Sequence, residues 1–311
     1  MFLLSTALSK ETIFYHFVKN GLEKKIKIDE PLKKYTSYKI GGPVDFYCIP
    51  ENIKELKTIL SIAARENIPY ILIGNGTNLL IRDKGIRGIV IRLGKGFKKV
   101  ALSDTILKVG AGIGLSYVSK FAFHQNLSGL EFAYNIPGTI GGAIKNNAGF
   151  KSSSMADIVR RITILTKENK IKKIPRSNLR FYYRNCDLSE NTAIIIEAEF
   201  KLEIEKKEKI RSKIEENIKF RLNKQPLNYC NAGSVFKNPK DHFAGELIEK
   251  AGAKGLSKGQ AEVSKIHANF IINKGNASAN DILYLINEIE NRVQGKFGIR
   301  LEREIEIIGE E

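Results

Sequence analysis

Three glycine-rich clusters within about 75 residues constrain this chain more than any other feature of its sequence. They read "GNGTN" at 74–78, "GAGIG" at 110–114 and "PGTIGGAIKNNAG" at 137–149. Glycine has no Cβ, so the backbone amides of such loops can approach an anion closely. Any one cluster is typical of ordinary turns. Three glycine clusters together bury few side chains and so weaken the packing of the core. Binding of a ligand with an extended pyrophosphate would explain why they are present.

The usual dinucleotide-binding fold is disfavoured. A helix is predicted over 52–67, where five apolar residues share one face, followed by the strand-like "YILIG" and the first glycine cluster. A Rossmann fingerprint needs a third glycine before its helix, but Leu79 follows Asn78 here. The next stretch, "LLIRDKGIRGIVIRL", alternates like β-structure.

The pattern changes beyond residue 205, which indicates a separate α+β domain. A helix is expected there with an apolar stripe repeating every four residues, at Ile210, Ile214, Ile218 and Leu222. A second helix fits "SANDILYLINEIENRVQGKF", capped by Ser278 or Asn280. The terminal "IRLEREIEII" reads as a strand with isoleucines and leucine on one face and Glu302, Glu304 and Glu306 on the other. Acids on an outer strand face are usually solvated.

Composition narrows the partners and the compartment. At 311 residues the chain has room for two or three domains, and its net charge of +17 favours an anionic partner, although the lysines are spread along the whole chain. The three cysteines form no C-x-x-C pair, so no disulfide framework, zinc knuckle or other metal site is expected. No apolar run approaches the roughly 18 residues of a membrane span, and "MFLLSTALSK" lacks the positive stretch of a signal peptide. A cytoplasmic protein is expected.

The segment "NAGSVFKNP" at 231–239 places Ser234 directly after a glycine. Serine and glycine build turns, and a lone hydroxyl is a weak acid and nucleophile until a neighbour activates it. The residues alone leave both interpretations open.

The order and spacing of eight motifs resemble the UDP-N-acetylenolpyruvoylglucosamine reductase (MurB) family. The motifs are "YTSYKIGGPVDF", "IGNGTNLLI", "LEFAYNIPGTIGGAIKNNAG", "FYYRN", "NAGSVFKNP", "AGELIEKAGAKG", "HANFIIN" and "LEREIEIIG". The resemblance covers about residues 32 to 309. The short connection between the helix after 278 and the terminal strand, without a tyrosine loop, looks like the second structural type (type II) of that family.

The resemblance implies an α+β fold with a two-lobed FAD-binding region of the PCMH, or vanillyl-alcohol oxidase, type and a smaller α+β substrate-binding domain. The boundaries that follow are an N-terminal helical extension over 1–31, the FAD-binding region over 32–204, the substrate-binding domain over 205–298 and a terminal strand with the catalytic glutamate over 299–311. The two lobes would divide near residue 100.

The resemblance also implies site residues. Arg184, Ser234 and Glu304 match the catalytic positions. Candidates to hold FAD are Gly74, Asn75, Gly76, Thr77, Asn78, Gly138, Thr139, Gly141, Gly142, Asn147 and Gly149. Candidates to hold the substrate are Tyr183, Lys224, Asn238 and His267.

The implied reaction is NADPH-dependent reduction of UDP-N-acetylglucosamine enolpyruvate to UDP-N-acetylmuramate through FAD, in peptidoglycan precursor synthesis. Hydride addition at C3 pushes charge onto C2 and the carboxylate, where an arginine and a protonated or hydrogen-bonding glutamate can stabilise it. A hydroxyl near C2 then donates the proton, which makes Ser234 a reagent. No motif separates NADPH from NADH.

Departures from the family pattern occur at Asn135, at Lys145-Asn146 and at Cys186. Asparagine tolerates the left-handed conformation that a glycine would adopt, so the turn at Asn135 is expected to survive. Two alternatives stay open: another PCMH-type flavin oxidase that uses oxygen, and a basic nucleic-acid-binding protein. None of the four histidines lies inside a glycine motif, where a covalent flavin link would be sought, and aromatic–basic interleaving of the RNP type is absent.

Overall fold

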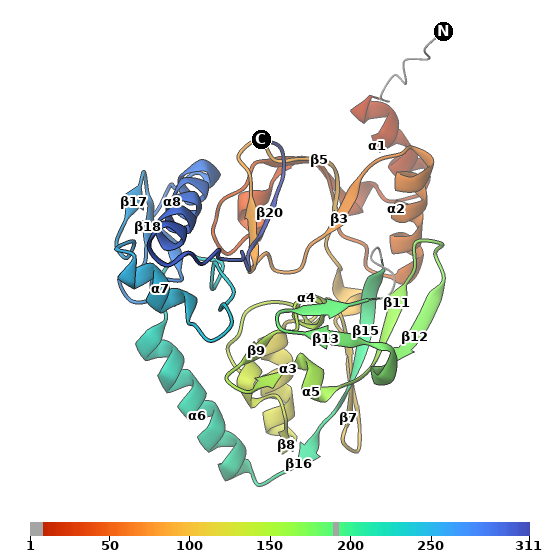
Figure 1. The fold of residues 1–311 in the computed structure, drawn as a ribbon. Coiled ribbons are helices and arrows are strands. Elements are labelled where there is room, and N and C mark those ends of the chain that lie inside the picture. Colours follow the sequence, from red (N-terminus) through yellow and green to blue (C-terminus); the bar gives the residue numbers. More distant parts are fainter. Residues whose placement is uncertain (1–8, 189–192) are drawn as a thin grey trace.

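The first lobe is built on a four-stranded sheet of order β1-β2-β5-β3. The computed structural model describes residues 9–188 and 193–311. In it β1 (Ile26–Pro31) pairs antiparallel with β2 (Pro43–Cys48), while β2 and β3 (Tyr70–Leu72) pair parallel with β5 (Ile86–Ile91). The helices α1 (Lys10–Lys19) and α2 (Ile53–Arg65) lie together beside this sheet (Figure 1). The helix expected over 52–67 is confirmed, with Asn52 as its N-cap.

The expected N-terminal helical extension is wrong in its last six residues. Residues 26–31 form β1, the edge strand of the first-lobe sheet, and Ile26 is buried in its core. The short helix α1 precedes it and buries Ile13 and Phe17. Residues 1–8 of that extension lie outside the described residues. The other domain boundaries remain predictions.

The second lobe is an antiparallel five-stranded sheet of order β12-β11-β15-β7-β6. Its strands are β6 (Val100–Ser103), β7 (Ile106–Gly110), β11 (Val159–Leu165), β12 (Ile171–Pro175) and β15 (Ile194–Lys201). Three helices accompany it, α3 (Leu115–His124), α4 (Ile140–Lys145) and α5 (Met155–Ile158). Three two-stranded ladders join β8 (Leu127–Ser128) to β16 (Glu203–Ile204), β9 (Gly149–Phe150) to β10 (Ser153–Ser154), and β13 (Arg180–Tyr182) to β14 (Asn185–Asp187).

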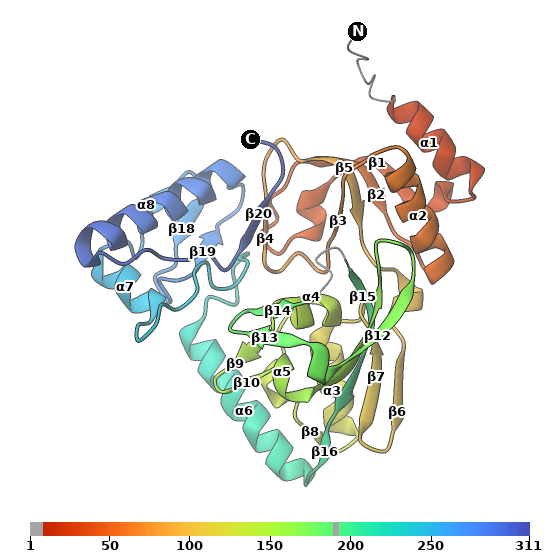
Figure 2. The same ribbon diagram turned by 45° about the vertical axis from the view of Figure 1, so that its right-hand side comes forward.

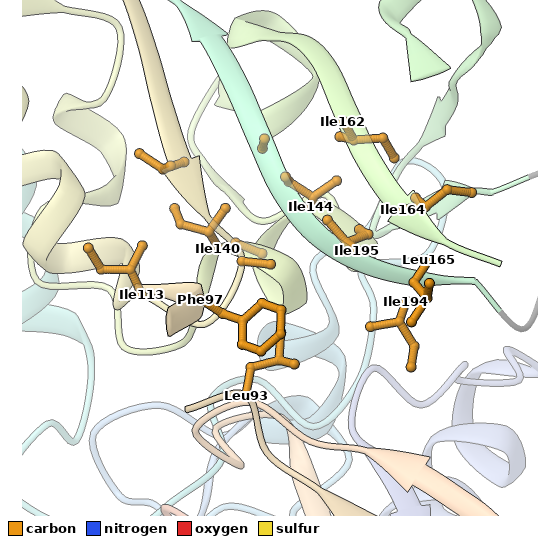
Figure 3. Close-up of a cluster of buried hydrophobic side chains, with 14 of the residues drawn as sticks. Leu93, Phe97, Ile113, Ile140, Ile144, Ile162, Ile164, Leu165, Ile194 and Ile195 are labelled. Atoms are coloured by element: carbon orange, nitrogen blue, oxygen red, sulfur yellow. The ribbon is translucent and has the colours of Figure 1, made fainter. Parts of the chain in front are cut away.

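One buried apolar cluster runs through both lobes. It joins Phe46 and Leu56 of the first lobe to Val109 and Ile162 of the second. Figure 3 shows the part where Leu93 and Phe97 meet Ile140, Ile144 and the paired strands β11 and β15. Because the two sheets share this core, the segments between them are held at fixed positions.

The third domain has a small antiparallel sheet and three helices. Its strands are β17 (Ser257–Lys258), β18 (Ala261–Val263) and β19 (Ile271–Asn273), and its helices are α6 (Lys207–Lys224), α7 (Ala244–Lys250) and α8 (Ala279–Phe297). Figures 1 and 2 show α6 as a long helix that connects the second lobe to the rest of this domain. The expected second helix is confirmed as α8, with Ser278 as N-cap in a capping box with Asp281.

The apolar stripe expected on α6 is wrong at its last position. Ile210 and Ile214 are buried, but Leu222 is 63% exposed and Arg221 takes the buried position at 8%. A helix turns about 100° per residue, so residue 221 lies roughly 20° from residue 210 around the axis and residue 222 roughly 120° away. A constant spacing of four residues therefore moves away from the buried face of the helix by residue 222.

The terminal strand is shorter than expected. Only β20 (Glu306–Ile308) is a strand, and it pairs parallel with β4 (Leu79–Ile81) of the first lobe. Residues 299–305 are irregular apart from a bridge between Arg303 and Phe236. Figure 2 shows the chain end crossing back from the third domain to β4.

Two features are absent from the described residues. No helix there combines the length and apolarity needed to cross a bilayer. No group of three or more His, Cys, Asp or Glu side chains in residues 9–188 and 193–311 is arranged to hold a metal ion.

Candidate active site

A cavity of about 1490 Å³ opens where the two lobes and the third domain meet. The glycine loops at 74–78 and 137–142 form part of its wall, together with Gly149. The segment 227–234 and Glu304 also line it. Residues from all three parts of the chain therefore face one volume, which has room for a large cofactor and a substrate together.

The first glycine loop follows β3 and is fixed by side chains around it. Asn75 Nδ2 donates to the Gly138 carbonyl at 3.1 Å, and Asn75 Oδ1 accepts from Arg92 Nη2 at 3.0 Å. Ser37 donates its backbone N–H and its hydroxyl to the Gly76 carbonyl, at 3.1 and 3.2 Å. Asn75 thus joins the first loop to the third cluster, and Arg92 sets which way its amide faces.

The third cluster begins α4, a short helix that the sequence analysis did not anticipate. Thr139 is its N-cap, and its hydroxyl accepts from the Gly142 N–H at 3.4 Å. The second cluster and the residue after it are hydrogen-bonded to this segment: Leu115 N donates to the Gly138 carbonyl at 3.1 Å, and Gly141 N donates to the Ala111 carbonyl at 2.9 Å. Of the second cluster's own glycines only Gly112 reaches the cavity wall.

These loops fit the diphosphate of FAD. A Cβ on Gly74 would lie 2.5 Å from Thr139 Oγ1, and Gly76 and Gly138 have φ of +60° and +130°, where side chains are rarely tolerated. These glycines let the two loops pack closely against their neighbours while both loops line the cavity. Arg92 adds a positive charge to the wall beside them.

Arg184 lies in the two-residue turn between β13 and β14, in the left-handed region at φ +57°. That conformation is uncommon for arginine and carries backbone strain. Its Nε lies 2.9 Å from Glu304 Oε1, and its Nη1 donates to the Gly149 carbonyl at 3.2 Å. The buried Nε–H nevertheless has no aligned hydrogen-bond acceptor among the described residues. The turn thus holds the guanidinium between the third glycine cluster and the chain end.

Glu304 is largely buried, unlike its neighbour Glu302, whose side chain is 72% exposed. Burial raises the pKa of Glu304, and the positive charges of Arg184 and Lys237 oppose that shift without cancelling it. The expectation that the terminal acids are solvated is therefore wrong for this one. Its backbone is fixed by Asn78, whose Nδ2 donates to the Glu304 carbonyl at 3.0 Å.

Ser234 is brought beside Glu304 by backbone pairing. Glu304 N donates to the Val235 carbonyl and Lys237 N donates to the Glu302 carbonyl, each at 2.8 Å. Ser234 lines the cavity, and its hydroxyl has no hydrogen-bond partner within the described part of the chain. The hydroxyl is therefore available to a ligand.

Asn147 does not reach the cavity wall as the described residues form it. Its Nδ2 donates to the Tyr182 carbonyl at 2.8 Å and its Oδ1 accepts from Ala156 N at 3.0 Å. It is buried and shapes the loop from beneath.

The four candidate substrate residues lie outside this cavity wall. Tyr183 is 55% exposed beside Arg184, and Asn238 Oδ1 accepts from Ala244 N at 3.0 Å, at the start of α7. His267 Nδ1 accepts from Asn269 N, and burial, assisted by Lys254 and Lys224, lowers its pKa. Lys224 is exposed at the end of α6. Lys224 and His267 are close enough to interact electrostatically.

Two arginines of the wall were missed by the sequence analysis, Arg92 and Arg221. Arg92 follows the alternating strand β5, and nothing in the sequence marks its direction. Arg221 had a detectable signal, since the α6 helix period places it on the buried face.

The departures from the family pattern have simple structural readings. Asn135 has φ +59°, so the expected left-handed turn is confirmed. Lys145 is exposed on the cavity wall at the end of α4, and Cys186 is buried in the core of the two lobes.

Comparisons with known proteins agree with this geometry. Residues 44–174 match the profile of the FAD binding domain family, and residues 225–308 match that of the UDP-N-acetylenolpyruvoylglucosamine reductase C-terminal domain. A UDP-N-acetylenolpyruvoylglucosamine reductase of Clostridioides difficile is 40% identical over 98% of this chain and 100% of its own length. One of Caldanaerobacter subterraneus is 44% identical over 93% of this chain and 95% of its own. The crystal structure of the Thermus caldophilus reductase (MurB) superposes with a TM-score of 0.80 at 35% identity, over 92% of this chain and 98% of that one.

The two-lobed α+β fold of PCMH type, the glycine loops on the cavity wall and the matched FAD-binding profile define a FAD-dependent oxidoreductase. More narrowly, the chain belongs to the UDP-N-acetylenolpyruvoylglucosamine reductase (MurB) family.

Proposed function

We propose that this protein reduces UDP-N-acetylglucosamine enolpyruvate to UDP-N-acetylmuramate, with NADPH as reductant and FAD as bound cofactor, in peptidoglycan precursor synthesis. Relatives that carry this reductase name match nearly the whole chain. The single structural observation that carries the proposal is the convergence of Arg184, Ser234 and Glu304, from three distant segments, on a cavity whose wall includes the glycine loops.

The chemistry supplied by bound FAD is hydride transfer, from NADPH in the first half-reaction and to the enolpyruvyl carbon C3 in the second. The loops at 74–78 and 137–142 would hold its diphosphate, with Gly149 and the underlying Asn147 completing the site.

Arg184 and Glu304 would bind the carboxylate of the enolpyruvyl group. Negative charge grows on that carboxylate as C3 gains hydride, so donors already in place stabilise the transition state more than the ground state. A glutamate with a raised pKa retains its proton more readily and can then donate to the carboxylate oxygen.

Ser234 would donate its proton to C2. Serine is a poor acid in water, but the carbanion-like centre formed at C2 is basic enough to take that proton. The serine's free hydroxyl on the cavity wall supports this role.

Tyr183, Lys224, Asn238 and His267 would meet the sugar nucleotide where it extends beyond the cavity towards the third domain. We accordingly assign residues 32–204 to the FAD-binding region, 205–298 to the substrate-binding domain and 299–311 to the segment that delivers Glu304. NADPH is a reductant of the cytoplasm, so we propose that the protein acts there, without nucleic acid or membrane partners.

The test is anaerobic. Purified protein should show flavin absorption bands, NADPH should bleach them, and enolpyruvyl UDP-N-acetylglucosamine should restore them with formation of UDP-N-acetylmuramate. A protein that is reoxidised only by oxygen would instead be an oxidase of the same fold, and a colourless one that retains RNA would be a nucleic-acid binder.

A further inference from the structure

Glu304 is held through its main chain by two segments that lie far apart in the sequence. Its N–H donates to the Val235 carbonyl at 2.8 Å, and its own carbonyl accepts from Asn78 Nδ2 at 3.0 Å. Val235 follows Ser234, and Asn78 closes the first glycine loop. The peptide groups on the two sides of Glu304 therefore link the proposed proton donor to the loop that would hold the FAD diphosphate.

Asn78 contacts this end of the chain at a second point. Its carbonyl accepts from Glu306 N at 2.9 Å, where the parallel pairing of β20 with β4 begins (Figure 2). The two bonds lie on either side of Ile305, which is buried. Any residue supplies a main-chain carbonyl, but the other bond needs a side-chain donor of suitable length. The side-chain bond is therefore the contact for which the residue type matters.

The strand pairing at the chain end does not reach Glu304. The strand β20 begins at Glu306, and residues 299–305 are irregular apart from the bridge between Arg303 and Phe236. The direction of the Glu304 carbonyl is therefore fixed by the Asn78 amide and not by a β-ladder. Without that bond the peptide group after Glu304 is free to rotate, and the side chain moves with the main chain.

The position of the Glu304 carboxyl matters because its surroundings are specific. Its Oε1 lies 2.9 Å from Arg184 Nε, and the side chain is largely buried. Groups that stabilise a growing charge depend on their placement, and a misplacement of about 1 Å can slow a reaction about a hundredfold. A residue that fixes the main chain of this glutamate can therefore affect the reaction without touching the substrate.

The first glycine loop is also held by residues other than Asn78. Asn75 Nδ2 donates to the Gly138 carbonyl, and Ser37 donates its N–H and its hydroxyl to the Gly76 carbonyl. Removal of the Asn78 side chain leaves these bonds in place, so the loop should keep its shape. The effect of this side chain on Glu304 is thus separable from FAD binding by the loop.

We propose that Asn78 is a positioning residue for Glu304, and that its side-chain amide holds the glutamate at a fixed place relative to the flavin-binding loop. The bond joins the cofactor side of the cavity to the substrate side, so the acid meets the enolpyruvyl carboxylate while C3 faces the flavin. This inference rests on the proposed function and adds a residue to its second half-reaction.

A double-mutant cycle tests this role. Asn78→Ala, Glu304→Ala and the double variant are loaded with FAD, and their FAD content is measured by absorbance. Rapid mixing then measures flavin reduction by NADPH and reoxidation by the enolpyruvyl substrate. The matched control is Asn273→Ala, because Asn273 Nδ2 also donates to a main-chain carbonyl of the first lobe, that of Tyr38. Asn273 is not among the described residues that line the cavity.

Asn78→Ala is expected to load with FAD, to be reduced at a rate within about threefold of the parent, and to be reoxidised about tenfold to hundredfold more slowly. In the Glu304→Ala background the same change should slow reoxidation by less than about threefold, because its effect passes through Glu304. Asn273→Ala removes a bond of the same kind and should leave reoxidation at the parent rate.

Carbon-13 NMR titration of the Glu304 carboxyl gives a second readout, which needs no substrate. Glu304→Gln identifies the signal by its absence. Burial raises the pKa of Glu304 in the parent, against the charges of Arg184 and Lys237. A chain end released from Asn78 admits water, so this pKa should fall in Asn78→Ala towards that of an ordinary glutamate. It should stay raised in Asn273→Ala.

The proposal is overturned if Asn78→Ala is reoxidised at the parent rate, if it loses FAD, or if the pKa of Glu304 is unchanged in it. A loss in the double variant equal to the product of the two single losses would also overturn it, because the two residues would then act independently. Failure of the proposed function is distinct, since the parent enzyme itself would then not be reoxidised by the enolpyruvyl substrate, while the NMR titration would still test the link between Asn78 and Glu304.

Discussion

Ser234 and Glu304 show how the catalytic wall is assembled from single residues. The two lie on paired backbone segments, so their relative position is set by main-chain hydrogen bonds. The serine hydroxyl is unpartnered among the described residues, and the buried carboxyl has a raised pKa. An unpartnered hydroxyl on the cavity wall and a carboxyl with a raised pKa are both suited to proton transfer.

Ser234→Ala should separate the two half-reactions. Removal of the proposed acid leaves Arg184 and Glu304 in place, so flavin reduction by NADPH should stay near the parent rate. Reoxidation by the enolpyruvyl substrate should slow by roughly 10²–10⁴, and Ser234→Cys should recover part of that loss. Rapid mixing measures each step. An alanine variant that reoxidises as fast as the parent would return Ser234 to the status of a turn residue.

Glu304 should give the reoxidation step a pH dependence. Burial raises its pKa, so its protonated form persists to a higher pH than that of an exposed glutamate. If the protonated form is the active one, the rate is full below this raised pKa and falls as pH rises through it. Glu304→Gln keeps a donor that does not titrate, so its pH–rate profile should lack this falling limb. Persistence of the same limb in the variant would assign it to another group.

At the scale of elements, the glycine loops and α6 show two different uses of local geometry. The first loop depends on positions that only glycine fills easily, since a Cβ on Gly76 would lie 2.3 Å from the Tyr35 carbonyl at φ +60°. The helix depends on its rotation, which carries Arg221 rather than Leu222 to the buried face. In both elements, the residue at one position decides how the cavity wall is built: Gly76 lets the first loop lie against Tyr35, and Arg221 lines the cavity.

Gly76→Val should abolish FAD retention. The added side chain would first meet the backbone of Tyr35 and Thr36, so the loop must move away from the position that presents its amides. FAD per folded protein, from absorbance and circular dichroism, measures the effect. Gly275→Ala is a matched control because its Cβ would meet nothing within 4 Å and its φ is not in the left-handed range. A valine variant that folds and stays yellow would remove this loop from the flavin site.

For the whole molecule, the third domain contacts the second lobe through α6 and the first lobe through its other elements. The strands β4 and β20 pair, Asn273 Nδ2 donates to the Tyr38 carbonyl at 2.9 Å, and Tyr38 lies in the third domain's apolar core. Asp83 of the first lobe accepts from the N–H groups of Ala279 and Asn280, at 2.9 and 3.2 Å, at the start of α8. These contacts hold Glu304 against the first glycine loop.

Asp83→Ala should therefore lower stability while leaving FAD bound. Two helix N–H groups lose their acceptor, and loss of such a cap costs about 0.5–2 kcal/mol. Denaturant unfolding would measure the change, with Glu215→Ala, an exposed acid of α6, as a charge-matched control. Equal stability of the Asp83 variant and the parent would show that the cap does not contribute to docking.

Local pattern accounted for much of the fold. The α2 and α8 helices, the strand-like stretches around the glycine loops and the left-handed turn at Asn135 were each predicted, because periodicity, capping residues and turn chemistry act between near neighbours. The predictions were wrong where contacts with residues far away in the chain decide the local structure. Residues 26–31 became a strand by pairing with β2, and residues 299–305 stayed irregular while they crossed between two parts of the molecule.

The sequence by itself determined the family, the glycine-rich clusters and the identities of Arg184, Ser234 and Glu304 as candidates. Only the tertiary structure decided that these three face one cavity, that Glu304 is buried while Glu302 is exposed, and that Arg221 reaches the same wall without an acid beside it. The physical reason is that burial and electrostatic surroundings belong to contacts between segments far apart in the chain, which residue type and local spacing do not specify.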